Sequence, residues 1–105
     1  MSYANTYERE GCMERLTKAA GDNRYFVEGD KIKQDPNGYY GEAVERLAVF
    51  ENMYEGLVRS QSEISKELER LRREGKKNSF KFRELMGKKL INSNTLILLK
   101  NYGLE

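Results

Sequence analysis

Histidine and tryptophan are absent from this chain of 105 residues, and cysteine and proline occur once each. Without histidine the chain has no imidazole for acid–base catalysis, no Ser–His or Cys–His nucleophile pair, and none of the commonest metal ligand. The single cysteine, Cys12, cannot form an intramolecular disulfide, which agrees with a reducing compartment. These absences argue against a metal site and against most classes of enzyme.

Long apolar runs are also missing, because no stretch approaches the roughly 20 apolar residues that span a bilayer. Residues 1–12 lack the basic start and the apolar run of a secretory signal. We therefore expect a cytoplasmic protein that has no membrane contact. The carboxylates are spread at salt-bridge spacing rather than set among apolar residues, so we expect a binding protein with no catalytic residue and no cofactor.

The composition leaves little material for a globular core. Charged residues make up 34% of the chain and hydrophobic residues 38%. A chain of this length forms one small domain, so its apolar residues must be concentrated along one stripe, as in long helices or self-associating chains. Residues 1–12 show no periodicity and are predicted to be a flexible extension, while residues 13–105 are predicted to form a single domain.

Residues 13–40 carry the signals of a small β-hairpin. Two clusters of β-favouring residues, at 16–17 and 25–27, are separated by Ala-Ala-Gly-Asp-Asn, which favours a reversal of the chain. Asp35-Pro36-Asn37-Gly38 then suits a type I turn that closes this region. A helix is expected to begin directly after it.

Residues 41–74 are predicted to form one long helix. Eight apolar residues and one glutamine recur at alternating steps of four and three. This spacing places them on one side of a helix about 50 Å long. We call this row the seam: Ala43, Leu47, Phe50, Tyr54, Leu57, Gln61, Ile64, Leu68 and Leu71. Gly75 stands where a C-terminal stop belongs.

Gly56 offers an alternative, because glycine weakens a helix and Ser60 with Glu63 resembles the capping box of a new one. Two shorter helices would follow from a break there. The four-three register passes through Gly56 unshifted, however, and this favours the continuous helix.

A continuous seam needs a partner surface. We expect a homodimer in which the residues from Leu47 to Leu71 pair with a second copy and Gln61 fixes the register. The alternative is that the seam packs against the hairpin and the C-terminal helices of the same chain.

The C-terminal region is predicted to contain two short helices. Ser79 or Asn78 can cap a helix over residues 80–90, a turn follows at 92–94, and an apolar helix over 94–102 ends near Gly103. The pair superficially resembles a helix-turn-helix, but its second helix is too apolar to read base edges. The expected fold class is therefore mostly α (α+β), with a small hairpin, one long helix and two short helices.

The strongest functional signal is a basic band over residues 70–89, where nine basic and two acidic residues give a net charge of +7. Residues 1–69 carry −5. Such a band can neutralise phosphates of DNA or RNA, with Phe80 or Phe82 available for stacking. The alternative is a solvated face with cations near a helix C-terminus. The candidate binding residues are Arg70, Arg72, Arg73, Lys76, Lys77, Lys81, Arg83, Lys88 and Lys89.

Several segments resemble small proteins carried by phages and prophages of Firmicutes. These segments are 13–17, 42–48, 81–86 and the closing stretch from Asn92 to Leu104, so the similarity covers most of residues 13–105. Proteins of this kind include anti-CRISPR and other anti-defence factors. The resemblance implies interference with a host nucleoprotein and supplies no active site.

Two hypotheses follow from the sequence. The first is a phage-type inhibitor of a host defence complex that binds a protein or ribonucleoprotein through its charged surfaces. The second is an accessory nucleic-acid-binding or regulatory protein of phage DNA metabolism that uses the basic band on phosphate directly.

Overall fold

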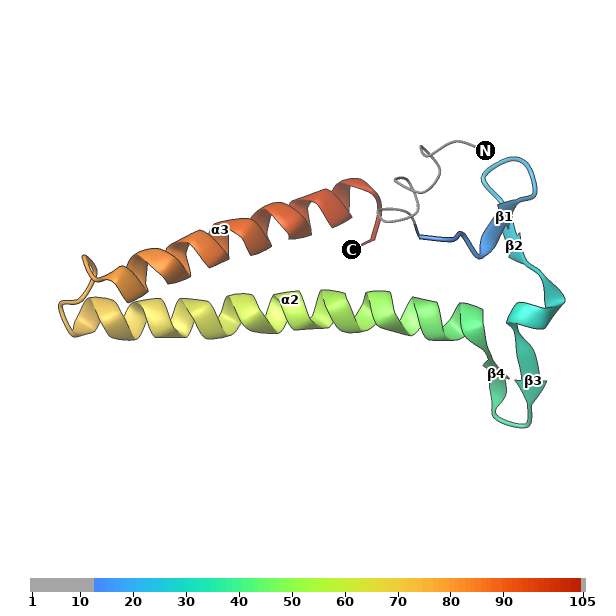
Figure 1. Ribbon diagram of the computed structural model, residues 1–105, viewed down its shortest axis with the longest axis horizontal. Coiled ribbons are helices and arrows are strands. Elements are labelled where there is room, and N and C mark those ends of the chain that lie inside the picture. Colours follow the sequence, from blue (N-terminus) through green and yellow to red (C-terminus); the bar gives the residue numbers. More distant parts are fainter. Residues whose placement is uncertain (1–12, 105) are drawn as a thin grey trace, which may run out of the picture. The chain divides into compact units, whose positions relative to one another are not determined.

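The computed structural model describes residues 13–104, which form two β-hairpins followed by two helices (Figure 1). The expectation of a mostly helical chain with a small β part is confirmed. The chain divides into two compact units, one up to Ala48 and one from Val49 on, and the first long helix belongs to both. The predicted flexible extension, residues 1–12, lies outside the described residues.

The first hairpin is the predicted one. Strand β1 (Thr17–Ala19) pairs antiparallel with β2 (Tyr25–Val27). Gly21, Asp22 and Asn23 all have positive φ, a conformation that glycine, asparagine and aspartate tolerate best, and this reverses the chain within five residues.

A second hairpin surrounds the Asp35–Gly38 turn. Strand β3 (Lys33–Asp35) pairs with β4 (Gly38–Tyr40), and Asn37 N–H donates to Asp35 Oδ1 at 2.8 Å. The sequence predicted only a closing turn here, whereas the structure has a two-stranded hairpin around that turn. Lys33 and Gln34 gave no alternating apolar pattern, so the strand that they form could not be recognised from hydrophobicity.

Gly41 joins this hairpin to the first long helix, α2 (Glu42–Arg73). Its φ is +125°, and a Cβ at this position would lie 2.8 Å from the carbonyl oxygen of Lys31. Only glycine fits this close approach. The Lys31 ammonium lies 3.4 Å from the Glu42 carboxylate, and this attraction raises the pKa of Lys31.

Helix α2 runs through Gly56 without a break, so the continuous helix is confirmed over the pair of shorter ones. A Cβ at Gly56 would meet nothing within 4 Å, so no close packing requires the glycine. The helix ends at the predicted stop. Gly75 has φ +73°, its N–H donates to Arg72 O, and Lys76 N–H donates to Leu71 O, which together form a Schellman cap.

The C-terminal region forms one helix, α3 (Phe80–Asn101), and the prediction of two short helices was wrong. Ser79 caps its start, since Ser79 Oγ accepts from Phe82 N–H at 3.1 Å. The polar residues taken as a turn lie inside the helix because their side chains find partners on α2. Asn92 Nδ2 donates to Ser60 Oγ at 3.2 Å, and Gln61 Nε2 donates to Ser93 Oγ at 2.9 Å.

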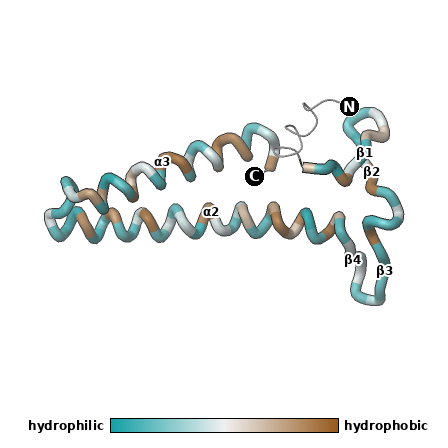
Figure 2. The backbone as a smooth tube through the Cα atoms, viewed as in Figure 1, coloured by the Kyte–Doolittle hydropathy of each residue, from teal (hydrophilic) through white to brown (hydrophobic). Residues whose placement is uncertain are grey.

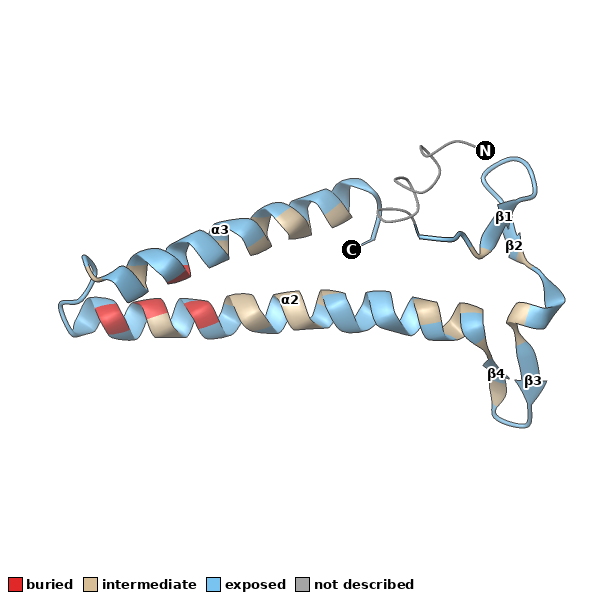
Figure 3. Cartoon of the chain, viewed as in Figure 1, coloured by how far each residue is buried: buried red, intermediate tan, exposed pale blue. Residues whose placement is uncertain are grey.

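The described core lies where α2 and α3 meet, close to the turn between them (Figure 3). Ile64, Leu68 and Leu71 of α2 are buried together with Leu85 of α3, and the partly buried Phe82 packs against them. Elsewhere apolar and polar residues are interspersed along both helices (Figure 2). No helix within residues 13–104 combines the length and the apolar character needed to cross a bilayer.

Leu68 is the most buried of these side chains, with 1% of its surface exposed. We expect Leu68→Ala to lower the free energy of unfolding by about 3 kcal/mol, from the lost transfer energy and the cavity left behind. Leu98→Ala, at a position that is 55% exposed, is the control and should change it by less than about 0.5 kcal/mol. Denaturant unfolding followed by circular dichroism measures both, and equal effects would contradict the assigned core.

Candidate nucleic-acid interface

All nine basic candidates lie within residues 70–89, which comprise the end of α2, the connecting loop and the first half of α3. We call these residues the hairpin tip. Three lie at the end of α2, two in the connecting loop and four in the first half of α3. The Gly75 and Ser79 caps fix the loop between the helices. The structure therefore gathers at one end of the helical hairpin a set of cations that are up to 19 positions apart in sequence.

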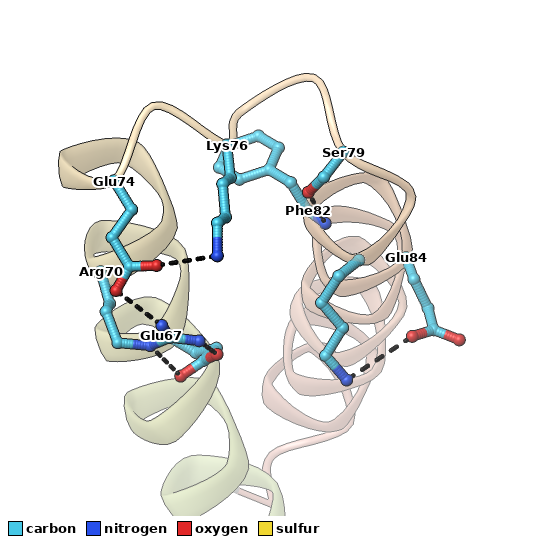
Figure 4. A network of polar contacts seen from close by, with 8 residues as sticks. Glu67, Arg70, Glu74, Lys76, Ser79, Phe82 and Glu84 are labelled. Atoms are coloured by element: carbon cyan, nitrogen blue, oxygen red, sulfur yellow. Dashed lines mark hydrogen bonds and ion pairs between the residues drawn. The ribbon is translucent and has the colours of Figure 1, made fainter.

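Part of this charge is neutralised by carboxylates in the tip and by Glu67 just before it (Figure 4). The Arg70 guanidinium bonds to the carboxylate of Glu67 and, at 2.8 Å, to that of Glu74. Lys76 lies 3.2 Å from Glu74, and Lys81 lies 3.7 Å from Glu84. These three cations are held by carboxylates and are less available to an external phosphate.

The arginine between the two carboxylates shifts their protonation. Hydrogen bonds from Arg70 lower the pKa of Glu67 and, joined by Lys76, that of Glu74. The same contacts, first with Glu67 and then with Glu74, raise the pKa of Arg70. Arg70 and Glu74 are exposed and Glu67 is partly exposed, so the pairs fix side-chain positions and add little to stability.

Six cations of the tip have no carboxylate within 4 Å among the described residues: Arg72, Arg73, Lys77, Arg83, Lys88 and Lys89. Of these, Arg73, Lys77, Arg83 and Lys88 are exposed and lie over no aromatic ring of the described chain. Arg72 instead lies over the ring of Phe82, 5.3 Å from its centroid. Lys89 is half-buried, and its carbonyl oxygen accepts a hydrogen bond from Gln61.

The cations surround the tip rather than sharing one flat face. On α3, Lys81 and Lys88 are seven residues apart and lie on the same side, whereas Arg83 lies on another side. The two aromatic candidates also separate, because Phe80 is 75% exposed and Phe82 packs against the core. The arrangement can therefore place several cations around a phosphate backbone, with Phe80 available to a base.

The seam residues divide into two groups. Ile64, Leu68 and Leu71 are buried under α3 of the same chain, and Gln61 bonds to α3 as well. Leu47 and Phe50 are exposed, whereas Tyr54 and Leu57 are partly buried. The second half of the seam is thus covered within one chain, which was the alternative to a dimer. Pairing of the seam with a second copy stays a prediction.

Residues 13–104 contain no group of three or more histidine, cysteine or carboxylate side chains that could hold a metal ion. Comparison with known proteins finds no family model, no curated protein and no solved structure that matches this chain. We therefore infer the function from the chemistry of the hairpin tip.

The paired carboxylates of the tip give a pH prediction. Because Arg70 lowers the pKa of Glu67 and Glu74, the stability that these pairs add is present above the ordinary glutamate pKa and is lost as the pH falls through the lowered values. We expect Arg70→Ala to raise both carboxylate pKa values toward the ordinary value, as followed by NMR titration of the side-chain carboxyl carbons.

The matched control is Arg73→Ala, because Arg73 has no described carboxylate partner. This variant should leave the pKa values of Glu67 and Glu74 close to those of the unchanged chain. Equal shifts in the two variants would show that general charge, and not the Arg70 contacts, sets the pKa values.

Proposed function

We propose that this chain is a non-enzymatic inhibitor of phage or prophage type, which binds a host defence nucleoprotein through the cations of its hairpin tip. The observation that carries the proposal is a set of four exposed cations, Arg73, Lys77, Arg83 and Lys88, that have neither a carboxylate nor an aromatic partner among the described residues and lie around a capped turn. The resemblance to small phage proteins supports the choice of a defence complex as the target class.

The charge distribution supports an oriented contact. The tip carries +7, whereas residues 1–69 carry −5, so an anionic surface attracts one end of the helical hairpin and repels the acidic segments. Phosphates on the guide or target strand of a nucleoprotein are anions of the required kind. Contacts of this kind place the protein on the backbone without reading the base sequence.

A second candidate function is direct binding of free nucleic acid, as an accessory protein of phage DNA metabolism. The exposed Phe80 ring favours it, because an aromatic side chain beside cations is the usual platform for an unstacked base. The two functions differ in their ligand. The inhibitor needs a surface of an assembled complex, whereas the accessory protein binds a bare strand.

The test removes the four cations together, as Arg73→Ala, Lys77→Ala, Arg83→Ala and Lys88→Ala. The control removes the same charge elsewhere, as Arg24→Ala, Lys33→Ala, Arg59→Ala and Lys66→Ala, all at exposed positions. In cells that carry a nucleic-acid-guided defence system, we expect the unchanged chain and the control to restore phage plating and the tip variant to lose that effect. A tip variant as active as the control would contradict the proposal.

Fluorescence anisotropy with labelled single-stranded RNA and DNA separates the two functions. If the accessory function is the right one, the chain binds bare strands with a log K that falls by about 0.7 per phosphate contact for each decade of salt, and the tip variant loses most of this dependence. An inhibitor of an assembled complex shows weak binding to bare strands. If all three proteins bind bare strands equally and none restores plating, both functions are wrong.

A further inference from the structure

Helix α3 carries apolar residues on more sides than one chain can cover. The side that faces α2 bears Leu85, Leu96 and Leu99, which are buried or partly buried. Met86, Leu90 and Ile97 form a second row and are 41%, 62% and 56% exposed. A helix with apolar residues on several sides is normally covered on several sides.

The second row lies on one identifiable side of the helical hairpin. Its members are four and seven residues apart, which places them in one strip along α3, with Ser93 between Leu90 and Ile97. Ser93 Oγ accepts from Gln61 Nε2 at 2.9 Å, so this strip adjoins α2 at Gln61.

The same side of α2 is mixed, because the apolar Val58 is followed at steps of four, three and four by Ser62, Ser65 and Glu69. Val58 precedes Gln61 by three residues, so both lie on neighbouring parts of one helical surface, and Val58 is 46% exposed. We call the surface formed by Val58, Met86, Leu90 and Ile97 the strip face. It spans both helices of the hairpin within the second compact unit.

We propose that a second copy of this chain packs on the strip face and forms a four-helix bundle in which the two hairpin tips point in opposite directions. Bundles of this kind bury about three positions in every seven on each helix, which is what the inner row and the strip of α3 provide together.

Charge complementarity selects the second copy and its direction. The tip carries +7, whereas residues 49–58 contain Glu51 and Glu55 and no basic residue. Parallel packing brings two tips of +7 together, which is costly. Antiparallel packing instead sets each tip beside the acidic segment of the other copy.

The size of the face is sufficient for a stable dimer. Helix α3 has 22 residues and is about 33 Å long, and two adjacent helices are about 20 Å wide. Their common face therefore measures about 660 Å², close to the roughly 800 Å² that each partner buries in a standard interface. Met86, Leu90 and Ile97 run along the α3 half of this face and supply most of its apolar area.

The proposal is tested by the mass of the full chain in solution. Sedimentation equilibrium at micromolar concentration should give twice the 12.3 kDa of one chain. Leu90→Glu should give the mass of one chain, because a carboxylate is then forced into the apolar interface. A chain that is monomeric without substitution would overturn the proposal and leave the strip face to a different protein.

Ile91→Glu is the matched control, because Ile91 and Leu90 are neighbours with similar exposure, 65% and 62%, and lie on different sides of α3. This variant should keep the mass of two chains. Both variants should keep the circular dichroism of the unchanged chain, since both positions are exposed in one chain. If Ile91→Glu dissociates the dimer and Leu90→Glu does not, the strip face is the wrong surface.

The direction of packing is tested by the distance between the two hairpin tips of the dimer. A spin label on Lys77→Cys, in a chain that also carries Cys12→Ser, marks each tip once. Antiparallel packing places the two labels about 40 Å apart, because each lies about 13 positions from the middle of α3 at about 1.5 Å per position. A short distance between the labels would show parallel packing and overturn the antiparallel bundle. Arg83 lies seven residues before Leu90 and therefore adjoins the strip face. Leu90→Glu leaves all four cations of the functional test in place, so the dimer can fail without the proposed function.

Discussion

The small apolar cluster that joins the end of α2 to the start of α3 is the contact on which the helical hairpin depends. Ile64, Leu68, Leu71 and Leu85 are the buried residues of the described chain, and they lie in the part of the hairpin nearest the loop (Figure 3). This contact turns α3 back along α2, and the turn brings cations from two helices to one tip. It also leaves the other sides of α3 uncovered, so one constraint accounts for both the basic tip and the exposed strip.

The features that could be predicted from sequence are those set by local rules. The four-three spacing of the seam predicted a helix through Gly56, and the Gly75 and Ser79 signals predicted its end and the next start, because caps depend on a few neighbouring backbone groups. The first hairpin followed from residues that tolerate positive φ. Each of these judgements needed only residues within a few positions of one another.

The features that were missed depend on partners far apart in sequence. Asn92 and Ser93 favour a turn when considered alone, but Ser60 and Gln61 satisfy their side chains across the hairpin, and α3 continues. Their spacing from Leu85 and Leu99 was the available signal, since 85, 92 and 99 are exact heptad steps. Likewise, the charge of the band was visible in the sequence. The cations that Glu67, Glu74 and Glu84 neutralise could be identified only from the positions of these side chains in the structure.

The most direct test of this account is an isotope-filtered NMR experiment on a mixture of labelled and unlabelled chains. We expect the methyl groups of Leu68 and Leu71 to show contacts with Leu85 of the same chain, because α3 covers this half of the seam. Contacts between Leu68 methyl groups of two different chains, with none to Leu85 of the same chain, would contradict it. The seam would then be a dimer interface, and the tip would lose the contact that assembles it.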